Sequence, residues 1–415
     1  MSFGLLGKKL SHSYSPYIHA MLGAYDYQLF EMEDEELDDF FENGDFNGLN
    51  VTVPYKEKVM KYVKCDAVSK KIGAVNTIYY KNGELIGTNT DYFGFMYLLS
   101  LHEINLAGKK VLILGTGGAS KTVFGVAKMC EAEKIFVASR QKSDKYVSYN
   151  TLPLDVDIII NATPVGMYPN NDEQPVDLSQ FTNLEAVIDL IYNPYQTKLL
   201  QQAEELGIKG VNGLSMLVAQ ATKAAKYFTG MNYLSYNKTL ITNIKAYTLN
   251  LVLIGMPGSG KSFIGEKLAE NTQRKFIDID GEISAMAGKT IADIFREDGE
   301  KYFRNLETEL LKKYCKESNL VIATGGGTIL RKENRDLIRS NSGVIFLERP
   351  LNELERKGRP LSVDDKTIQK LYDERKKYYD ETKDIAVTNN DKYEVIIDKI
   401  LDSLGEYYEK DYRNN

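Results

Sequence analysis

A glycine-rich loop that ends in lysine and serine lies in the second half of this 415-residue chain. It reads Gly255-Met256-Pro257-Gly258-Ser259-Gly260-Lys261-Ser262 and follows the apolar run 251–254. In such a loop backbone N–H groups surround phosphates, the lysine reaches the transferred group, and the last hydroxyl contacts Mg²⁺. The complete spacing therefore predicts an ATP site with Mg²⁺ at Ser262. The residues expected to bind ATP are Gly258, Ser259, Gly260, Lys261 and Ser262.

Two aspartates close the next apolar stretch, Phe276-Ile277-Asp278-Ile279-Asp280. Phosphoryl transfer to an alcohol needs a carboxylate that accepts the hydroxyl proton and a metal ion whose bound water is held in place. We assign the first role to Asp280 and the second to Asp278. Aspartates at such positions also cap helices, so these two residues alone leave a structural interpretation open.

A second glycine-rich turn, Gly115-Thr116-Gly117-Gly118-Ala119-Ser120, follows the predicted strand Lys110–Leu114. Such glycines let backbone N–H groups approach the pyrophosphate of a dinucleotide, although turns of this kind are common between any strand and helix. After the next strand, where an NAD site usually has Asp or Glu, the chain reads Ser139-Arg140-Gln141-Lys142. Arg140 and Lys142 suit a 2′-phosphate, which favours NADP(H) over a merely solvated basic turn.

One lysine and one aspartate in the first hundred residues are candidates for proton transfer. Lys56 ends the segment Asn50-Val51-Thr52-Val53-Pro54-Tyr55-Lys56, and Asp91 follows Asn89-Thr90. Facing each other across a cleft, they would deliver a proton to a carbonyl oxygen while hydride arrives from a nicotinamide. From spacing alone, isolated charges of this kind are more often surface residues.

The elements that must position these residues alternate between short apolar strands and helical patterns, which predicts parallel α/β sheets. A predicted helix over 237–247 passes directly into the strand before the ATP loop, so we place a module boundary near Thr248. The predicted strands are Lys110–Leu114, Lys134–Ala138, Val156–Asn161 and Ala186–Leu190, then Leu251–Ile254, Lys275–Ile279, Leu320–Thr324 and Val344–Leu347.

Composition excludes several classes of protein. The length predicts two or three domains, and the net charge of -6 argues against a nucleic-acid partner. No apolar run approaches the ~20 residues of a membrane span, and no signal peptide is visible. The scattered cysteines Cys65, Cys130 and Cys315 lack metal-ligand spacing and indicate reduced thiols in a cytoplasmic enzyme.

Residues 1–247 resemble shikimate dehydrogenase, because seven motifs occur in that family's order. They are Ser11–Pro16, Asn50–Lys56, Gly73–Thr77, Gly87–Asp91, Gly115–Ser120, Asn161–Met167 and Asn212–Gln220. The resemblance implies that Lys56 and Asp91 are the catalytic pair. The residues it implies for the substrate are Ser13, Ser15, Thr52, Asn76, Tyr192 and Gln220. Those it implies for NADPH are Gly115, Gly117, Gly118, Ala119, Ser139, Arg140 and Gly213.

Two features depart from the dehydrogenase pattern. The segment between Arg140 and Asp155 is shorter than usual, so we expect one helix of the cofactor lobe to be missing. The usual Asn-Arg-Thr is replaced by Ser139-Arg140-Gln141. The predicted NADP preference therefore depends mostly on Arg140 and nearby lysines.

Residues from about 249 to 390 resemble shikimate kinase through Gly299–Arg304, Thr324–Gly327, Gly358–Leu361 and Tyr372–Arg375. The resemblance assigns the shikimate carboxylate to the forked guanidinium groups of Arg304 and Arg375. It also implies that the backbone of Gly325–Gly327 approaches the ring. The resemblance also implies that Arg359 lies on a lid over ATP and that Arg356 stacks against the adenine. Both residues fall in a segment that is shorter here than is usual in the family.

The sequence thus predicts a bifunctional α/β enzyme that reduces 3-dehydroshikimate with NADPH and phosphorylates the resulting shikimate with ATP and Mg²⁺. We expect a two-lobed dehydrogenase over 1–247, with a substrate lobe (1–100 plus about 212–247) and a Rossmann-like NADP lobe (101–211). A P-loop kinase domain follows over 248–415. The alternatives are a quinate/shikimate dehydrogenase that uses NAD, or one module kept only for binding or regulation. The oligomeric state is left open.

Overall fold

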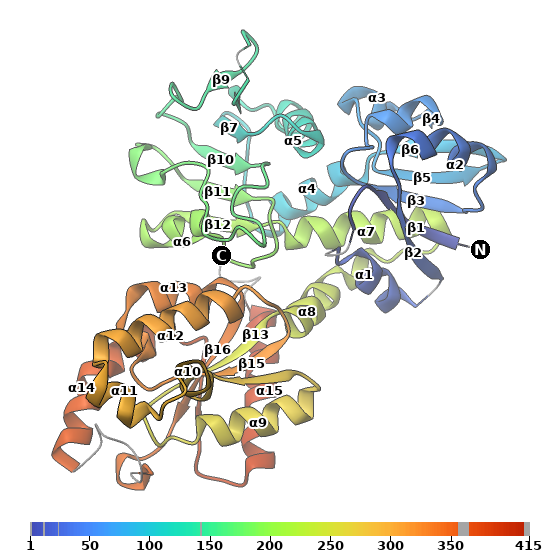
Figure 1. The fold of residues 1–415 in the computed structure, drawn as a ribbon. Coiled ribbons are helices and arrows are strands. Elements are labelled where there is room, and N and C mark those ends of the chain that lie inside the picture. The colour runs from blue at the N-terminus through green and yellow to red at the C-terminus, as the bar shows by residue number, and fades with distance from the viewer. Residues whose placement is uncertain (1, 11–12, 24, 142, 356–364, 411–415) are drawn as a thin grey trace.

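A mixed six-stranded sheet is the first of three sheets in this computed structural model, which describes residues 2–10, 13–23, 25–141, 143–355 and 365–410 (Figure 1). Its strand order is β2-β1-β3-β5-β6-β4, in which β5 runs antiparallel to β3 and β6. The strands are β1 (Ser2–Gly7), β2 (Asp26–Glu31), β3 (Gly48–Val51), β4 (Lys64–Cys65), β5 (Thr77–Lys81) and β6 (Glu84–Thr88). Its helices are α1 (Ser15–Leu22), α2 (Leu37–Asn43) and α3 (Ala67–Ile72).

The second sheet has the order β12-β11-β10-β7-β8-β9, and its strand pairs are parallel. The strands are β7 (Lys110–Leu114), β8 (Lys134–Ser139), β9 (Val147–Ser148), β10 (Ile158–Asn161), β11 (Ala186–Asp189) and β12 (Lys209–Asn212). The helices α5 (Gly118–Met129) and α6 (Lys198–Glu205) accompany it. This arrangement confirms the Rossmann-like lobe, because parallel strands joined by helices place the loops after β7 and β8 at one edge.

The third sheet, β14-β15-β13-β16-β17, is also parallel and confirms the predicted sheet of the second module. Its strands are β13 (Asn250–Ile254), β14 (Lys275–Asp278), β15 (Leu320–Ala323), β16 (Ser342–Glu348) and β17 (Ile385–Thr388). Its helices are α9 (Lys261–Thr272), α10 (Ile279–Ala287), α11 (Ile291–Glu297), α12 (Glu300–Tyr314), α13 (Lys332–Ser340), α14 (Asp365–Thr382) and α15 (Tyr393–Lys410).

Strand β13 is buried on both faces, which explains why its sequence is a continuous apolar run. Val252 and Ile254 join the core on one side, whereas Leu251 and Leu253 join a second core with residues of α9 and α15. Full burial of each such side chain contributes roughly 1.5–3 kcal/mol. The strand that leads into the ATP loop is thereby fixed from both sides.

The predicted strands agree with the structure apart from their ends. The largest effect is at Ile279, which begins α10 rather than ending β14, because Asp278 Oδ1 accepts the N–H of Gly281 at 3.2 Å and caps that helix. Between Arg140 and Asp155 the described residues form turns and β9 but no helix. The expected loss of a helix from the cofactor lobe is therefore confirmed.

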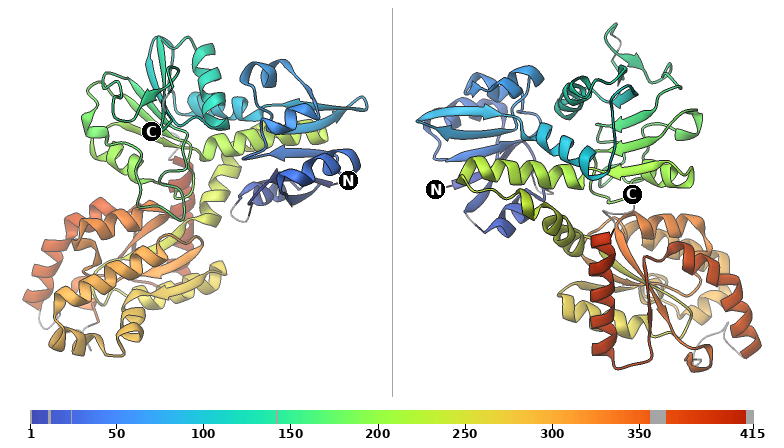
Figure 2. Two further views of the ribbon diagram at one scale, coloured as in Figure 1. Left: turned by 45° about the horizontal axis from the view of Figure 1, so that its top comes forward. Right: turned by 180° about the vertical axis from the view of Figure 1, so that it is seen from behind.

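Three helices connect the sheets. The helices α4 (Thr90–Leu101) and α7 (Leu214–Thr229) pack along each other between the first two sheets. Helix α8 (Asn237–Thr248) then runs towards the third sheet, where β13 begins two residues later (Figure 2). Helix α15 packs against α8, so this junction is braced as well as short.

The second sheet also contacts the second module directly, through the loop after β11 and through α6. Tyr195 N–H donates to Asn341 Oδ1 at 3.3 Å, and Gln196 N–H donates to Ser340 O at 2.8 Å. From α6, Gln201 Nε2 donates to Asp336 O at 2.7 Å. A polar cavity of about 740 Å³ is left beside these contacts. The interface is thus specific but hollow and polar, like interfaces between separable domains.

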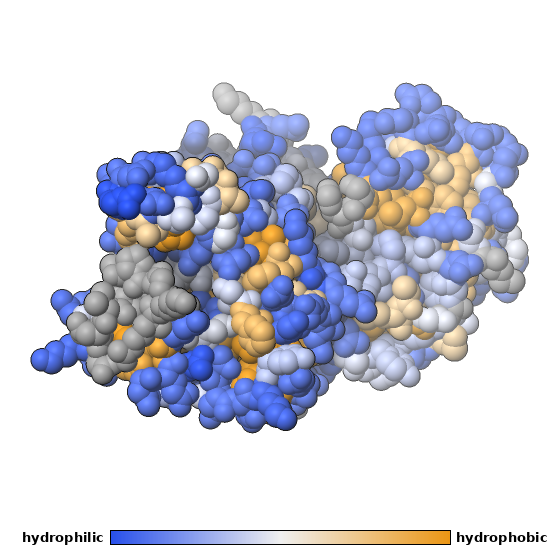
Figure 3. Space-filling model, turned by 60° about the horizontal axis from the view of Figure 1, so that its bottom comes forward, coloured by the Kyte–Doolittle hydropathy of each residue, from blue (hydrophilic) through white to orange (hydrophobic). Residues whose placement is uncertain are grey.

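Apolar residues reach the surface in patches that hydrophilic residues interrupt on the face shown in Figure 3. Phe263, Met286 and Tyr302 are exposed examples from the second module. Scattered exposure of this kind is normal for folded proteins. None of the helices in the described part of the chain has both the length and the apolar character needed to cross a membrane.

Candidate active sites

Lys56 and Asp91 meet where the first sheet faces the second. Lys56 lies in the loop after β3, and Asp91 lies in the first turn of α4, where the helix dipole favours a carboxylate. Lys56 Nζ is 2.6 Å from Asp91 Oδ2, and their side chains are 15% and 11% exposed. This near-buried pair can hold and pass a proton while remaining accessible to a small molecule.

Two amides lie close to the pair and share Thr90 as a neighbour. Asn76 Oδ1 accepts the Thr90 N–H at 2.6 Å and the Thr90 hydroxyl at 3.2 Å. Gln220 Oε1 lies 3.5 Å from the same hydroxyl. Because a backbone N–H can only donate, the Asn76 atom that faces it is the oxygen. Asn76 therefore turns its two Nδ2 hydrogens away from Thr90.

The other predicted substrate residues come from three loops. Ser13 Oγ accepts the N–H of Ser15, the first residue of α1, at 3.2 Å. Thr52 follows β3 directly and donates its N–H to Leu6 O at 2.9 Å. The Tyr192 ring lies 5.2 Å from that of Tyr14, between the two serines in sequence.

The glycine turn after β7 borders the lysine. A Cβ placed on Gly118 would lie 3.4 Å from Lys56 Cδ, so the lysine side chain passes close to this turn. Gly117 caps α5, and Gly118 and Ala119 form its first turn, so unpaired helix N–H groups point outward here. On the far side Gly213 packs so closely on Leu190 that a side chain would collide with its carbonyl group. The turn has the form of an anion site next to the proton-transfer pair.

The turn after β8 carries the predicted 2′-phosphate residues. Ser139 is buried, and its Oγ accepts the N–H of Gln141 at 3.0 Å. Arg140 is exposed, which leaves its guanidinium available to a ligand. Lys142, named with it from the sequence, lies outside the described residues.

The ATP loop joins β13 to α9 with a backbone that only glycine adopts readily. Gly258 and Gly260 have φ angles of 86° and 94°. Lys261 Nζ donates to Gly255 O at 3.0 Å and Met256 O at 2.9 Å, so it already bends over the loop. The buried Ser259 Oγ has no hydrogen-bond partner within the described residues. This arrangement fits a phosphate chain seated on the loop.

A magnesium ion fits the same place in the manner usual for nucleotide sites. Ser262 is exposed at the start of α9, and Asp278 uses only Oδ1 in its helix cap. Within the described residues no group of three or more His, Cys, Asp or Glu side chains is arranged to hold a metal ion. Mg²⁺ bound through phosphates, water and one protein hydroxyl needs no such group.

Asp280 lies in a buried acidic setting beside the loop after β15. A Cβ on Gly325 would be 2.9 Å from Asp280 Oδ1 and 2.8 Å from Glu307 Oε1. Burial, then the charges of Glu307 and Asp278, raise the pKa of Asp280 to about 6, although Lys261 and Arg304 oppose the shift. Asp280 Oδ1 has no hydrogen-bond partner in the described chain. Such a carboxylate is suited to accept a proton near neutral pH.

Arg304 and Arg375 are both buried, and both lie near Tyr379, whereas Arg304 also acts on the Asp280 carboxylate. Arg375 is 3% exposed, and its Nε and Nη1 have no hydrogen-bond partner among the described residues. Unpaired guanidinium hydrogens at that depth are costly unless an anion takes them. Tyr379 OH donates to Gly326 O at 2.6 Å and fixes the glycine loop against α14. The geometry fits a bound carboxylate.

Glu307 belongs to the same buried cluster and was not predicted from the sequence. Its side chain is fully buried, and its Oε2 accepts from Arg304 Nη1 at 2.9 Å. Its other oxygen accepts from the Thr328 hydroxyl, in the turn that follows the three glycines. Glu307 therefore orients Arg304 and the glycine loop together. The available signal was its place three residues after Arg304, on one face of α12.

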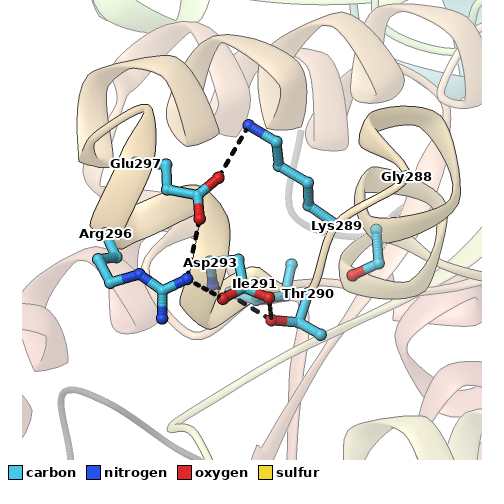
Figure 4. Close-up of a pocket in the computed structure, with 8 residues that line it drawn as sticks. Gly288, Lys289, Thr290, Ile291, Asp293, Arg296 and Glu297 are labelled. Carbon is cyan, nitrogen blue, oxygen red and sulfur yellow. Dashed lines mark hydrogen bonds and ion pairs between the residues drawn. The ribbon is translucent and has the colours of Figure 1, made fainter.

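Two predicted residues, Arg356 and Arg359, lie outside the described residues. A separate pocket of about 620 Å³ between α10 and α11 is drawn in Figure 4. Its charges pair with one another, since Glu297 lies 2.8 Å from Arg296 Nη2 and 3.3 Å from Lys289 Nζ (Figure 4). Its lining contains none of the predicted site residues, and we assign it no chemistry.

Comparison with known proteins gives separate matches for the two halves. A model of the shikimate dehydrogenase substrate binding domain matches residues 5–78, and a model of shikimate kinase matches residues 257–405. The curated shikimate dehydrogenase (NADP(+)) of Clostridium beijerinckii is 41% identical over 245 residues, which are 54% of this chain and 89% of that protein.

Solved structures agree with this result. Shikimate dehydrogenase 1 from Peptoclostridium difficile has a TM-score of 0.54 at 40% identity, covering 58% of this chain and 96% of its own. Shikimate 5-dehydrogenase from Thermus thermophilus, in complex with NADP(H) and shikimate, has a TM-score of 0.51 at 29% identity. That match covers 58% of this chain and 98% of the other.

Proposed function

Because this chain belongs to the shikimate dehydrogenase family and carries a shikimate kinase domain, we propose that it catalyses two consecutive reactions on one ring. In the first, NADPH reduces 3-dehydroshikimate to shikimate. In the second, ATP phosphorylates shikimate to shikimate 3-phosphate. The observation that carries the proposal is the Lys56–Asp91 contact of 2.6 Å beside the glycine turn, in a chain that also holds a complete ATP loop.

In the reduction, a nicotinamide held at the glycine turn would supply the hydride to the carbonyl carbon. Lys56, in contact with Asp91, gives a proton to the carbonyl oxygen, so that the ketone becomes an alcohol. Asn76 presents two N–H donors, and Gln220, Thr52, Ser13 and Ser15 complete the shell. Ser13 and Ser15 suit the carboxylate, because hydroxyl groups donate to an anion without burying a second charge.

In the phosphorylation, the alcohol made by the first reaction is the acceptor. Asp280 accepts the hydroxyl proton while Arg304 and Arg375 hold the carboxylate, and Glu307 keeps Arg304 in place. Lys261 neutralises charge on the transferred phosphoryl group. Ser262 would be the protein ligand of Mg²⁺, with Asp278 acting through water, and the ion would shield charge on the phosphate oxygens.

A coupled assay tests both reactions. The whole chain, given 3-dehydroshikimate and NADPH, is expected to oxidise NADPH without ATP. Addition of ATP and Mg²⁺ should then release ADP in proportion to the shikimate formed. Faster oxidation of NADH, or equal activity on quinate, would favour the quinate/shikimate alternative. Failure of one step with the other intact would favour a module that serves only binding or regulation.

The preference for NADPH is expected to depend on Arg140. Its guanidinium offers a charge-assisted hydrogen bond to a 2′-phosphate, worth roughly 1.5–3 kcal/mol. Arg140→Ala should therefore raise KM for NADPH by about tenfold or more and leave KM for NADH unchanged. Steady-state kinetics with both cofactors measure this, with Lys145→Ala, another exposed cation of the same segment, as the control. Equal use of NADH and NADPH by the unaltered chain would contradict the assignment.

We also propose that the boundary of the two modules lies at Thr248. Fragments 1–248 and 249–415 are expected to keep their separate activities, since each contains its own sheet and core. Both should melt at a lower temperature than the whole chain, because the contacts of Tyr195 and Gln201 are lost. Calorimetry and the two assays check this. Aggregated or inactive fragments would mean that neither half folds without the other.

A further inference from the structure

A chain of buried hydrogen bonds runs from the edge of the first sheet to the dehydrogenase site. Tyr27 OH, on β2, donates to Asn50 Oδ1 on β3 at 2.8 Å. Asn50 Nδ2 donates to Thr77 Oγ1 on β5 at 3.2 Å. Thr77 Oγ1 lies 2.9 Å from Thr90 Oγ1. Since Thr90 contacts both Asn76 and Gln220, three polar side chains link Tyr27 to the amides of the site.

The middle residues of this hydrogen-bond series have few other hydrogen-bond partners within reach. Asn50, Thr77 and Thr90 are all buried, with exposures of 4%, 0% and 1%. A buried hydroxyl or amide that loses its partner keeps its full desolvation cost, so each link depends on its neighbours. The hydroxyl of Tyr27 is the end group that fixes which way the Asn50 amide faces.

The ring of Tyr27 is also held in place. Burial raises the pKa of Tyr27 well above its ordinary value, so its hydroxyl keeps its proton. The ring stacks on His19 with centroids 3.9 Å apart and planes 8° apart. Burial lowers the pKa of His19 to about 3, so this stacking partner stays neutral. The phenol is thus held protonated, with its hydroxyl on Asn50 and its ring on His19.

We propose that Tyr27 is a positioning residue of the dehydrogenase site. Its hydroxyl orients, through Asn50, Thr77 and Thr90, the amides Asn76 and Gln220 on the hydroxyl side of the site. It fixes the direction in which these amides face without touching the substrate. This inference rests on the proposed dehydrogenase function, because it takes these residues as the ones that meet 3-dehydroshikimate.

The first test removes the single hydroxyl. Tyr27→Phe is expected to raise KM for 3-dehydroshikimate by about tenfold, the size expected for one lost buried hydrogen bond. KM for NADPH should stay the same, because the glycine turn is not part of this series of hydrogen bonds. Phosphorylation of added shikimate should also be unchanged.

Tyr25→Phe is the matched control. Tyr25 lies one residue before β2, and its hydroxyl bonds to His19 Nδ1 rather than to Asn50. It should lose thermal stability comparable to Tyr27→Phe and keep a normal KM. If both variants raise KM equally, Tyr27 acts only through packing and the proposal is wrong. If neither variant raises KM, the series of hydrogen bonds from Tyr27 to Thr90 has no positioning role.

The second test changes the other end of the chain. Thr90→Ser keeps the hydroxyl and should stay within about threefold of the unaltered enzyme, whereas Thr90→Val should raise KM by tenfold or more. The double variant Tyr27→Phe/Thr90→Val should cost less than the product of the single effects, because both break one network. If the KM increase of the double variant equals the product of the two single increases, the inference is wrong. An unaltered chain that never oxidises NADPH would instead refute the proposed function.

Discussion

Replacement of Lys56 with alanine is expected to lower NADPH-dependent reduction by ~10²–10⁴-fold while shikimate phosphorylation keeps its normal rate. Lys56 lies close to the glycine turn. Without its ammonium group, the buried carboxylate of Asp91 would lose the partner that it now holds at 2.6 Å. The kinase site lies in another module with its own sheet. Spectrophotometric assays of NADPH oxidation and of ADP release on the same preparation separate the two effects.

Lys58→Ala is the matched control for this loss. Lys58 lies two residues further along and pairs with Asp34 at the surface, where its side chain is 45% exposed. An exposed pair of this kind contributes little to stability, so the control should keep both activities. Near-normal reduction by Lys56→Ala, or an equal loss in Lys58→Ala, would show that the pair is not the source of the proton.

The site residues that belong to a local sequence motif could be predicted from the sequence. The glycines at 255–260 and 115–118 occur in fixed local spacings, and the local backbone alone decides what they do. Strands such as Leu251–Ile254 were recognisable because burial on both faces requires a continuous apolar run. The pairing of Lys56 with Asp91 required more, namely the resemblance, because two lone charges carry no spacing of their own.

Residues that act through long-range contacts could not be found in this way. Tyr27 reaches Asn50 only because β2 and β3 flank the same strand, β1. Glu307 was within reach of sequence reasoning through its helical spacing from Arg304, yet its burial and its bond to Thr328 depend on the tertiary fold. Tyr195 contacts the kinase module through its backbone N–H, and a backbone contact cannot be predicted from the type of residue. In each case the fold, and not the local sequence, brings the partners together.

Asp280→Asn is expected to lower shikimate phosphorylation by ~10²–10⁴-fold and to leave reduction unchanged. An amide is nearly the same size as a carboxylate but cannot accept the hydroxyl proton, so shikimate binding should be kept while turnover is lost. Calorimetric titration with shikimate and initial rates of ADP release measure the two quantities separately. Asp293→Asn, an aspartate of the same module that bonds Thr290 and Arg296 outside the site, is the control.

The pH dependence of the kinase provides a sharper version of the same test. Burial and the charge of Glu307 raise the pKa of Asp280 to about 6, and the base must be ionised to accept a proton. The kcat/KM for shikimate should therefore fall as the pH drops below about 6. Glu307→Gln removes the nearby negative charge, so the pKa of Asp280 should decrease and the acid limb should move to lower pH. An acid limb that stays in place in Glu307→Gln, or that persists in Asp280→Asn, would mean that another group accepts the proton.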